Sequence, residues 1–359
     1  MFELSASSST WRLTAESLAE VRAAASAIGS ARAAAARAGE ACALPPPPRC
    51  LLDEVPPHAA AESGALQAAD EVQLLRWYQV QMQKLVGRGA AQKRLRRSHK
   101  VAATAIVLYK RFYLSHSVLE CEPMEFALCC IFVAGKLEDE FLSATDIAAA
   151  ASDGSDAASQ LEAAIFRAEP LLLAGVRFDL RVAHAHRPLA ALVDAAAREF
   201  KMDAKTQLPP LVDAAHEHLD ALMLTDAALL EAPTPIAVCA LRLAIRDLAL
   251  RGTAPLRPTP VELDAHVSAL VGAATLAAAE ALEAACPRPS AEAEAADAAD
   301  LKKVRKRVKK LALWSAKAPQ ANSPTKPTTP PPSDGTTPPP SSDGDGPDGP
   351  AAKKAKVED

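Results

Sequence analysis

Two stretches of this chain repeat each other at a distance of 110 residues. When residues 110–136 are shifted by that distance, leucines, a proline, alanines and a cysteine fall on residues of the same type. The identical pairs are Leu114 with Leu224, Leu119 with Leu229, Pro123 with Pro233, Ala127 with Ala237, Cys129 with Cys239 and Ala134 with Ala244. We infer that the chain contains two copies of one structural unit.

Each copy is predicted to be helical on both sides of a short loop. One apolar helix ends near Leu114 or Leu224, and the next begins at Pro123 or Pro233. Proline suits the first position of a helix because it has no N–H to leave unpaired and its φ angle is already helical. Small and apolar residues follow for three turns or more, which is typical of a helix that is buried nearly all round. Abundant alanine and scarce β-branched runs favour an all-α fold.

Helical patterns divide into two sets of five. The first set is predicted at 74–86, 101–114, 123–137, 143–151 and 160–176. The second set is predicted at 188–200, 208–222, 233–249, as a short piece at 260–264, and at 266–285. A further amphipathic helix is expected near the N-terminus, where Thr14 is a candidate N-cap and Leu18, Val21 and Ile28 form an apolar stripe.

Composition shifts suggest six segments along the 359 residues. They are an N-terminal segment with its helix (1–38), a Pro-rich linker (39–68), the first repeat (69–182), the second repeat (183–286), a charged helix candidate (287–317) and a Pro/Ser/Thr-rich tail (318–359). The tail has almost no apolar groups to bury, so we expect it to be disordered.

Several classes of protein are disfavoured by the sequence. The net charge is −4 and no apolar run approaches the length of a membrane span, so a soluble protein without a membrane partner is expected. Residues 1–10 lack the basic and apolar regions of a signal peptide, so secretion is not expected. No kinase motif, phosphate-binding loop or nucleophile elbow occurs, so we expect no catalytic residue and no cofactor.

A metal site is also not expected from local spacing. The seven cysteines contain no Cys-x-x-Cys pair. Two His-x-His pairs occur, but residues two apart on a helix point in different directions and no third ligand of matching spacing follows. The pairs are His184 with His186 and His216 with His218.

Four motifs together resemble one family. They are Lys110-Arg111-Phe112-Tyr113-Leu114, Lys136-Leu137-Glu138-Asp139-Glu140-Phe141, Arg187-Pro188-Leu189 and Leu224-Thr225-Asp226-Ala227. In this combination they resemble the cyclins, and within them the cyclin H family. The resemblance extends over about residues 74–249, and Trp11 with the N-terminal helix is similar to that family's N-terminal helix. It implies a fold of two tandem five-helix cyclin-box repeats.

The resemblance implies a regulatory subunit and not an enzyme. Such a subunit binds and activates a cyclin-dependent kinase of the CDK-activating type, together with a ring-finger assembly factor and the TFIIH core. The complex serves T-loop phosphorylation and phosphorylation of the C-terminal domain of RNA polymerase II, in the nucleus. Alternatives are a cyclin C-like subunit of the Mediator kinase module and a TFIIB-like DNA-binding factor. Basic faces on both repeats and a zinc ribbon would favour the latter; neither is visible, so direct nucleic-acid binding is not expected.

The resemblance also assigns kinase-binding residues. Lys136 and Glu169 match the lysine and glutamate that hold the kinase's regulatory helix region, and the neighbouring apolar positions are Leu137, Leu173 and Phe178. The chain departs from the pattern at Pro170, which removes a helical hydrogen bond and is expected to kink the helix beside Glu169.

Charged motifs near the C-terminus suggest regulation. Lys353, Lys354 and Lys356 resemble a nuclear import signal, with a chance basic patch as the alternative, and Ser323 lies in a Ser-Pro-x-Lys candidate phosphorylation site. The basic run 302–310 could bind nucleic acid, act as a localisation signal, pack on a partner helix or form a solvated helix.

Overall fold

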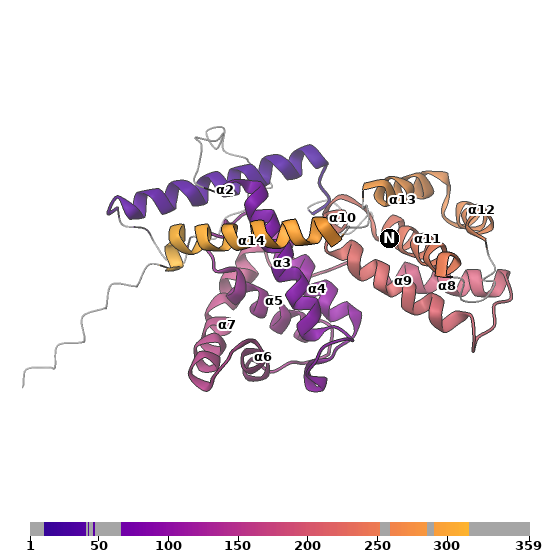
Figure 1. Ribbon diagram of the computed structural model, residues 1–359, viewed down its shortest axis with the longest axis horizontal. Coiled ribbons are helices and arrows are strands. Elements are labelled where there is room, and N and C mark those ends of the chain that lie inside the picture. The colour runs from indigo at the N-terminus through magenta and orange to yellow at the C-terminus, as the bar shows by residue number, and fades with distance from the viewer. Residues whose placement is uncertain are drawn as a thin grey trace, which may run out of the picture. The chain divides into compact units, whose positions relative to one another are not determined.

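The computed structural model describes residues 11–40, 42, 46, 66–251, 259–285 and 291–315. Every regular element in these ranges is an α-helix or a short 3₁₀ helix, which confirms the all-α class (Figure 1). Within the same ranges, no helix has both the length and the hydropathy that crossing a membrane requires. Most of the predicted linker 39–68 and all of the tail from 318 lie outside the described residues.

Five helices form the first helical set, with α5 at its centre. α5 contacts each of the other four. They are α3 (Ala68–Val86), α4 (His99–Tyr113), α5 (Pro123–Leu137), α6 (Ala144–Ala151) and α7 (Ser155–Gly175). Pro123 occupies the first turn of α5, as predicted. α3 and α7 begin earlier than predicted because their first turns are polar or alanine-rich and carry no apolar periodicity.

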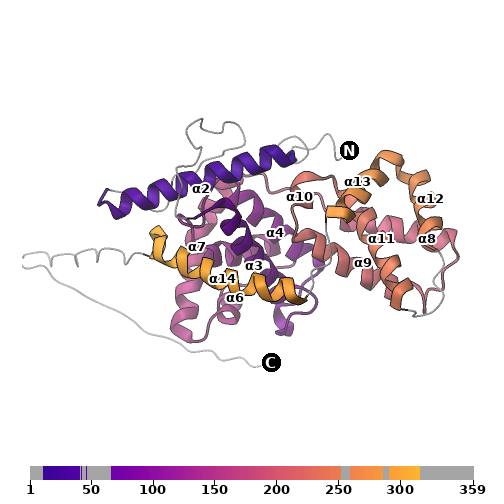
Figure 2. The same cartoon turned by 45° about the horizontal axis from the view of Figure 1, so that its top comes forward.

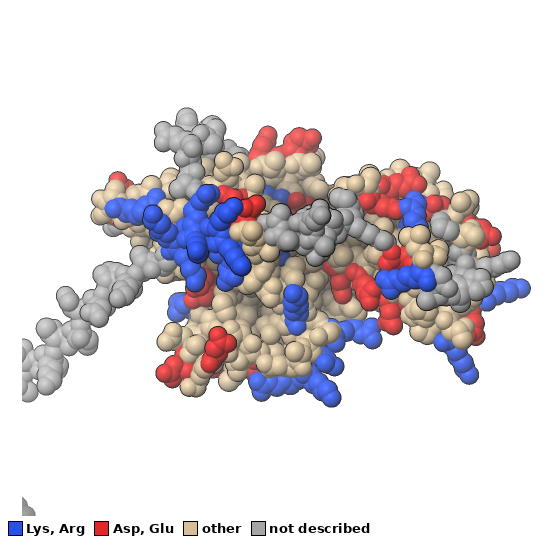
Figure 3. Space-filling model, viewed as in Figure 1, with Lys and Arg blue, Asp and Glu red and all other residues tan. Residues whose placement is uncertain are grey.

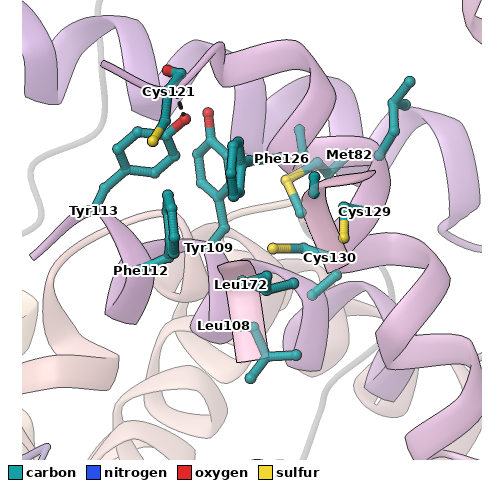
Figure 4. Close-up of a cluster of buried hydrophobic side chains, with 14 of the residues drawn as sticks. Met82, Leu108, Tyr109, Phe112, Tyr113, Cys121, Phe126, Cys129, Cys130 and Leu172 are labelled. Carbon is teal, nitrogen blue, oxygen red and sulfur yellow. Dashed lines mark hydrogen bonds between the residues drawn. The ribbon is translucent and has the colours of Figure 1, made fainter. Parts of the chain in front are cut away.

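Aromatic residues from α4 fill the core of this set (Figure 4). The rings of Phe112 and Phe126 stack with their centroids 4.2 Å apart. The two buried tyrosine hydroxyls donate hydrogen bonds to loop and helix-start carbonyls: Tyr109 to Pro123 and Tyr113 to Cys121, each at 3.1 Å. Because each buried hydroxyl has an acceptor, these rings can occupy the interior without a desolvation penalty.

The second helical set has its own buried core around α11. It contains α8 (His186–Glu199), α9 (Leu208–Met223), the short α10 (Ala227–Leu230), α11 (Pro233–Arg251), α12 (Pro260–Val271) and α13 (Ala273–Ala285). α4 and α9 end at residues 113 and 223, and α5 and α11 begin at 123 and 233, so both boundaries differ by 110 residues. The spacing of the sequence repeat is therefore also the spacing of the helices.

The last two helices of this set differ from the prediction. The sequence suggested a short piece at 260–264 and one helix from 266, but α12 continues to Val271 and α13 begins only at Ala273. Gly272 between them has φ +84°, a left-handed conformation that glycine adopts without steric cost. In an alanine-rich stretch a single glycine gives little warning of such a break.

Two helices from opposite ends of the chain pack on α3. α2 (Ala15–Arg37) and α14 (Ala291–Leu311) both contact it, as Figures 1 and 2 show. Thr14 caps α2 by accepting a hydrogen bond from the Ser17 N–H at 3.1 Å, as predicted. α14 buries Val304 and Val308, and its basic residues form the blue patch where α14 lies in Figure 3.

The structure therefore corrects the alternatives for the basic run 302–310. The apolar stripe of this run packs against the first helical set of the same chain. The segment after the run is held by two hydrogen bonds: Leu313 N–H to Leu119 O at 2.8 Å and Trp314 Nε1–H to Val118 O at 2.9 Å. The exposed face of α14 carries its lysines.

The Lys-Arg pair of the first motif joins the two helical sets. The buried Lys110 ammonium donates to the carbonyls of Met223, at 2.8 Å, and Thr225 at the end of α9. Arg111 Nη1 donates to the carbonyls of Asp179 and Arg181, at 3.1 and 3.0 Å, in the segment that connects the sets. Lys110 and Arg111 therefore have a structural role: they donate hydrogen bonds to backbone carbonyls at and beyond helix ends, which have no donor within a helix.

We expect Gly29→Ala to destabilise the docking of α2. A Cβ at this position would lie 2.2 Å from the Cβ of the fully buried Ser117. Overpacking of this kind costs about 1–3 kcal/mol, partly offset by the roughly 1 kcal/mol by which alanine favours a helix over glycine. Thermal unfolding measures the result. Gly89→Ala is the matched control, because a Cβ there meets nothing within 4 Å; equal melting temperatures for both variants would contradict the packing.

Candidate partner-binding surface

Four large apolar side chains are exposed on α5 and α7 or in the segments just after them. Their exposed fractions are 37% for Leu137, 63% for Phe141, 51% for Phe166 and 70% for Phe178. Phe141 and Phe166 both pack edge-on against the buried ring of Phe132, at centroid distances of 6.5 and 5.6 Å. We call these four residues the aromatic surface. Large exposed apolar residues that lie in a group indicate an interaction site, whereas such residues scattered singly over a surface are normal.

An ion pair lies within this surface. Lys136 Nζ at the end of α5 is 2.7 Å from Glu169 Oε1 on α7. The same ammonium lies 3.9 Å from the centroid of the Phe132 ring. Both charged groups are partly exposed, so their pairing adds little to folding stability. The Lys136–Glu169 pair can therefore open at little cost, so that each charged group forms hydrogen bonds to a partner instead.

Unusual backbone conformations flank the ion pair. Asp139, just after α5, and Arg177 and Phe178, just after α7, have φ angles of 56–57°. In the described residues only Lys201 shares this left-handed conformation among non-glycine residues. Side chains other than glycine adopt it at a cost, and such residues cluster at functional sites. At Phe178 the turn exposes the ring, held by the hydrogen bond from its N–H to Leu173 O at 2.9 Å.

Pro170 does not interrupt α7. The helix runs from Ser155 to Gly175, and Pro170 lies on its exposed side. The missing N–H leaves the carbonyl of Phe166 without its helical donor, but the carbonyl is on the same exposed side, where water can satisfy it. The expected kink does not move the Glu169 carboxylate away from Lys136.

Of the residues that the resemblance singled out, the structure pairs Lys136 with Glu169. Leu137 at the end of α5 and Phe178 just after α7 are exposed, and Leu173 near the end of α7 is half-buried. Their role in binding a kinase stays a prediction. Phe141 and Phe166 were not predicted as binding residues, because nothing in their local sequence separates an exposed phenylalanine from a buried one such as Phe126. The predicted import signal (Lys353, Lys354, Lys356) and Ser323 lie outside the described residues.

Comparisons with known proteins point to one family. The chain is 32% identical over 181 residues to Cyclin-H1-1 of Arabidopsis thaliana, covering 49% of this chain and 50% of that protein. It is 32% identical over 147 residues to Cyclin-H of Xenopus laevis, covering 39% and 43%. The matches therefore span about half the length of these curated relatives. No protein-family model matches the chain.

A solved structure shares the fold. A chain of the CAK complex from Chaetomium thermophilum bound to ATP-γ-S superimposes with a TM-score of 0.60 and 23% identity, over 87% of this chain and 88% of that one. Two helical sets whose central helices repeat at a 110-residue spacing, together with these relatives, define a cyclin fold. Over about half of its length the chain is similar to proteins of the cyclin H family.

Proposed function

We propose that this chain is the regulatory subunit that binds and activates a cyclin-dependent kinase of the CDK-activating type. The observation that carries the proposal is the aromatic surface around the Lys136–Glu169 pair, in a chain that is similar to the cyclin H family over about half of its length. The chain supplies no catalytic group in this proposal; the kinase supplies the chemistry.

The surface suits the docking of a helical segment. The four apolar side chains of the aromatic surface provide burial, and aromatic residues contribute most to interfaces of this kind. Lys136 and Glu169 form charge-assisted hydrogen bonds to the partner's backbone, which fix its orientation. Held in this way, the regulatory helix of the kinase completes the Lys–Glu ion pair that its active site needs.

Further partners follow from the family. We propose a ring-finger assembly factor as the third subunit and the TFIIH core as the larger assembly, with kinase T-loops and the C-terminal domain of RNA polymerase II as substrates. A nuclear location fits these substrates. The import signal at Lys353, Lys354 and Lys356 remains a prediction, which alanine substitution and imaging of a tagged protein would test.

The test is reconstitution with a kinase of the CDK-activating type. We expect a stable one-to-one complex, a large rise in phosphorylation of a kinase T-loop substrate, and no phosphotransfer by this chain alone. Lys136→Ala and Glu169→Ala should each weaken the complex about 5- to 150-fold in Kd, because they leave partner groups buried and unpaired, at about 1–3 kcal/mol. The double variant should fall short of additivity, since both residues hold one segment.

A second ion pair provides the control. Arg167 on α7 pairs with Glu125 at the start of α5, at 3.0 Å. Glu125 is three turns from Lys136, about 16 Å along the helix. Alanine at both Arg167 and Glu125 should leave activation unchanged. Equal losses from both pairs would mean that helix stability, not contact with the kinase, explains the result.

A further inference from the structure

Histidines from three helical segments gather where the two helical sets meet. His99 is the first residue of α4, His186 is the first residue of α8, His184 lies two residues before it, and His216 is on α9. The ring centroids of His99 and His216 are 4.7 Å apart, those of His186 and His216 are 6.0 Å apart, and those of His99 and His186 are 6.1 Å apart. Four of the eight histidines in the chain thus occupy one place.

Several ring nitrogens in this cluster have no hydrogen-bond partner among the described residues. His186 is only 6% exposed, and neither of its ring nitrogens has a partner. His99 Nε2 is likewise buried and unpartnered, while its Nδ1 lies 2.7 Å from Asp220 Oδ2. A buried polar atom without a partner costs free energy, and it calls for a water, an ion or a functional role.

The geometry points to a binding site for a divalent transition-metal ion, and we propose that His99, His186 and Asp220 are its protein ligands. One donor atom from each of the three lies within 4.8 Å of the other two. In a tetrahedral site with bonds of about 2.0–2.2 Å, neighbouring ligand atoms are about 3.3 Å apart. Small side-chain rotations would close this difference. Two imidazoles and a carboxylate, with a fourth position for water, suit Zn²⁺.

The hydrogen bonds around the cluster leave ring nitrogens that can bind a cation. Neither ring nitrogen of His186 is engaged by a group of the described residues. His216 Nδ1 lies 2.8 Å from the carbonyl of Val212, which accepts a hydrogen bond from it, so the lone pair of this ring is at Nε2. The Asp220 carboxylate, which lies beside His99, supplies the negative charge that a bound cation needs.

A bound ion would link the two helical sets. His99 belongs to the first set, while His186 and Asp220 belong to the second. Since the site does not exist in the unfolded chain, the binding free energy adds to folding stability. Local spacing argued against a metal site, because only His186 of these ligands belongs to a His-x-His pair and the three ligands come from three separate helices. The inference does not depend on the proposed kinase partnership.

The full-length chain, stripped of metal with a chelator and then dialysed, tests the proposal. Titration calorimetry with a zinc salt alone should show one saturable site, and zinc should raise the melting temperature by several degrees. His99→Gln and His186→Gln should each weaken zinc binding at least tenfold and remove the thermal shift. Asp220→Asn should weaken it about 10- to 100-fold.

Controls separate this site from other zinc ligands. His266→Gln is the matched variant, because His266 lies beside Phe200 and outside the cluster; it should bind zinc as the parent does. Cobalt substitution should show no thiolate charge-transfer band, which excludes the free cysteines as ligands. His99 is partly exposed, so its variant should stay folded even if that of His186 does not, as circular dichroism would show. No saturable site, or full affinity in His99→Gln, would overturn the proposal.

Discussion

Replacing Phe141 and Phe178 together with serine is expected to reduce kinase activation more than 100-fold while leaving the chain folded. Both rings are mostly exposed, at 63% and 70%, so the free chain loses little packing. In the complex they would be buried, and truncating aromatic anchors at the centre of an interface commonly costs 2 kcal/mol or more each. Two such losses exceed a factor of 100 in Kd.

The measurement is activation of the kinase at increasing concentrations of the variant, beside thermal unfolding of the free chain. We expect the activation curve to shift to much higher concentration and the melting temperature to stay near that of the parent. Leu250→Ser with Val261→Ser is the matched control, since these residues are 78% and 79% exposed but belong to the second helical set. Full activation by the phenylalanine variant would rule out the aromatic surface as the kinase contact.

Lys110→Met is expected to remove a pH-dependent part of the folding stability. Burial lowers the pKa of Lys110 from 10.5 to about 7, against the partly compensating charge of Asp226. Between those two values the unfolded chain binds a proton that the folded chain does not. Stability therefore rises with pH across this window, by about 1.4 kcal/mol per pH unit at most. The methionine variant lacks this rise.

Denaturant unfolding of both proteins at pH 7 and pH 9.5 measures the effect. The parent should gain about 3 kcal/mol relative to the variant over this interval. The variant should also be less stable at pH 7, because the carbonyls of Met223 and Thr225 lose their donor, at about 1–3 kcal/mol. Lys84→Met, at an exposed position on α3, is the control and should change neither value. A constant difference between parent and Lys110→Met would contradict a lowered pKa.

The local signals in the sequence predicted the helices well. Pro123 and Pro233 mark the starts of α5 and α11, and Thr14 caps α2. These features depend on groups within one turn of each other, because a missing N–H or a capping oxygen acts only on the nearest backbone. Gly272 was missed because its effect depends on a φ angle that the sequence leaves open.

The candidate site was predicted only through a resemblance. Lys136 and Glu169 are 33 residues apart, and no local pattern pairs them. Phe126 and Phe132 are buried while Phe141 and Phe166 are exposed, although all four are phenylalanines in or next to helices. Exposure is decided by which helices pack on which faces, and that packing involves residues far apart in the chain.

By itself, the sequence determined that this chain is all-α and built from two similar helical sets, because proline position, capping and the 110-residue repeat are local or periodic signals. Only the tertiary structure decided what Lys110, Arg111 and the basic run 302–310 do. Lys110 and Arg111 satisfy carbonyls of distant segments, and α14 buries its valines against the first helical set. The cluster of His99, His186 and Asp220 arises in the same way, since each comes from a different helix and only the packing of the two sets brings them together.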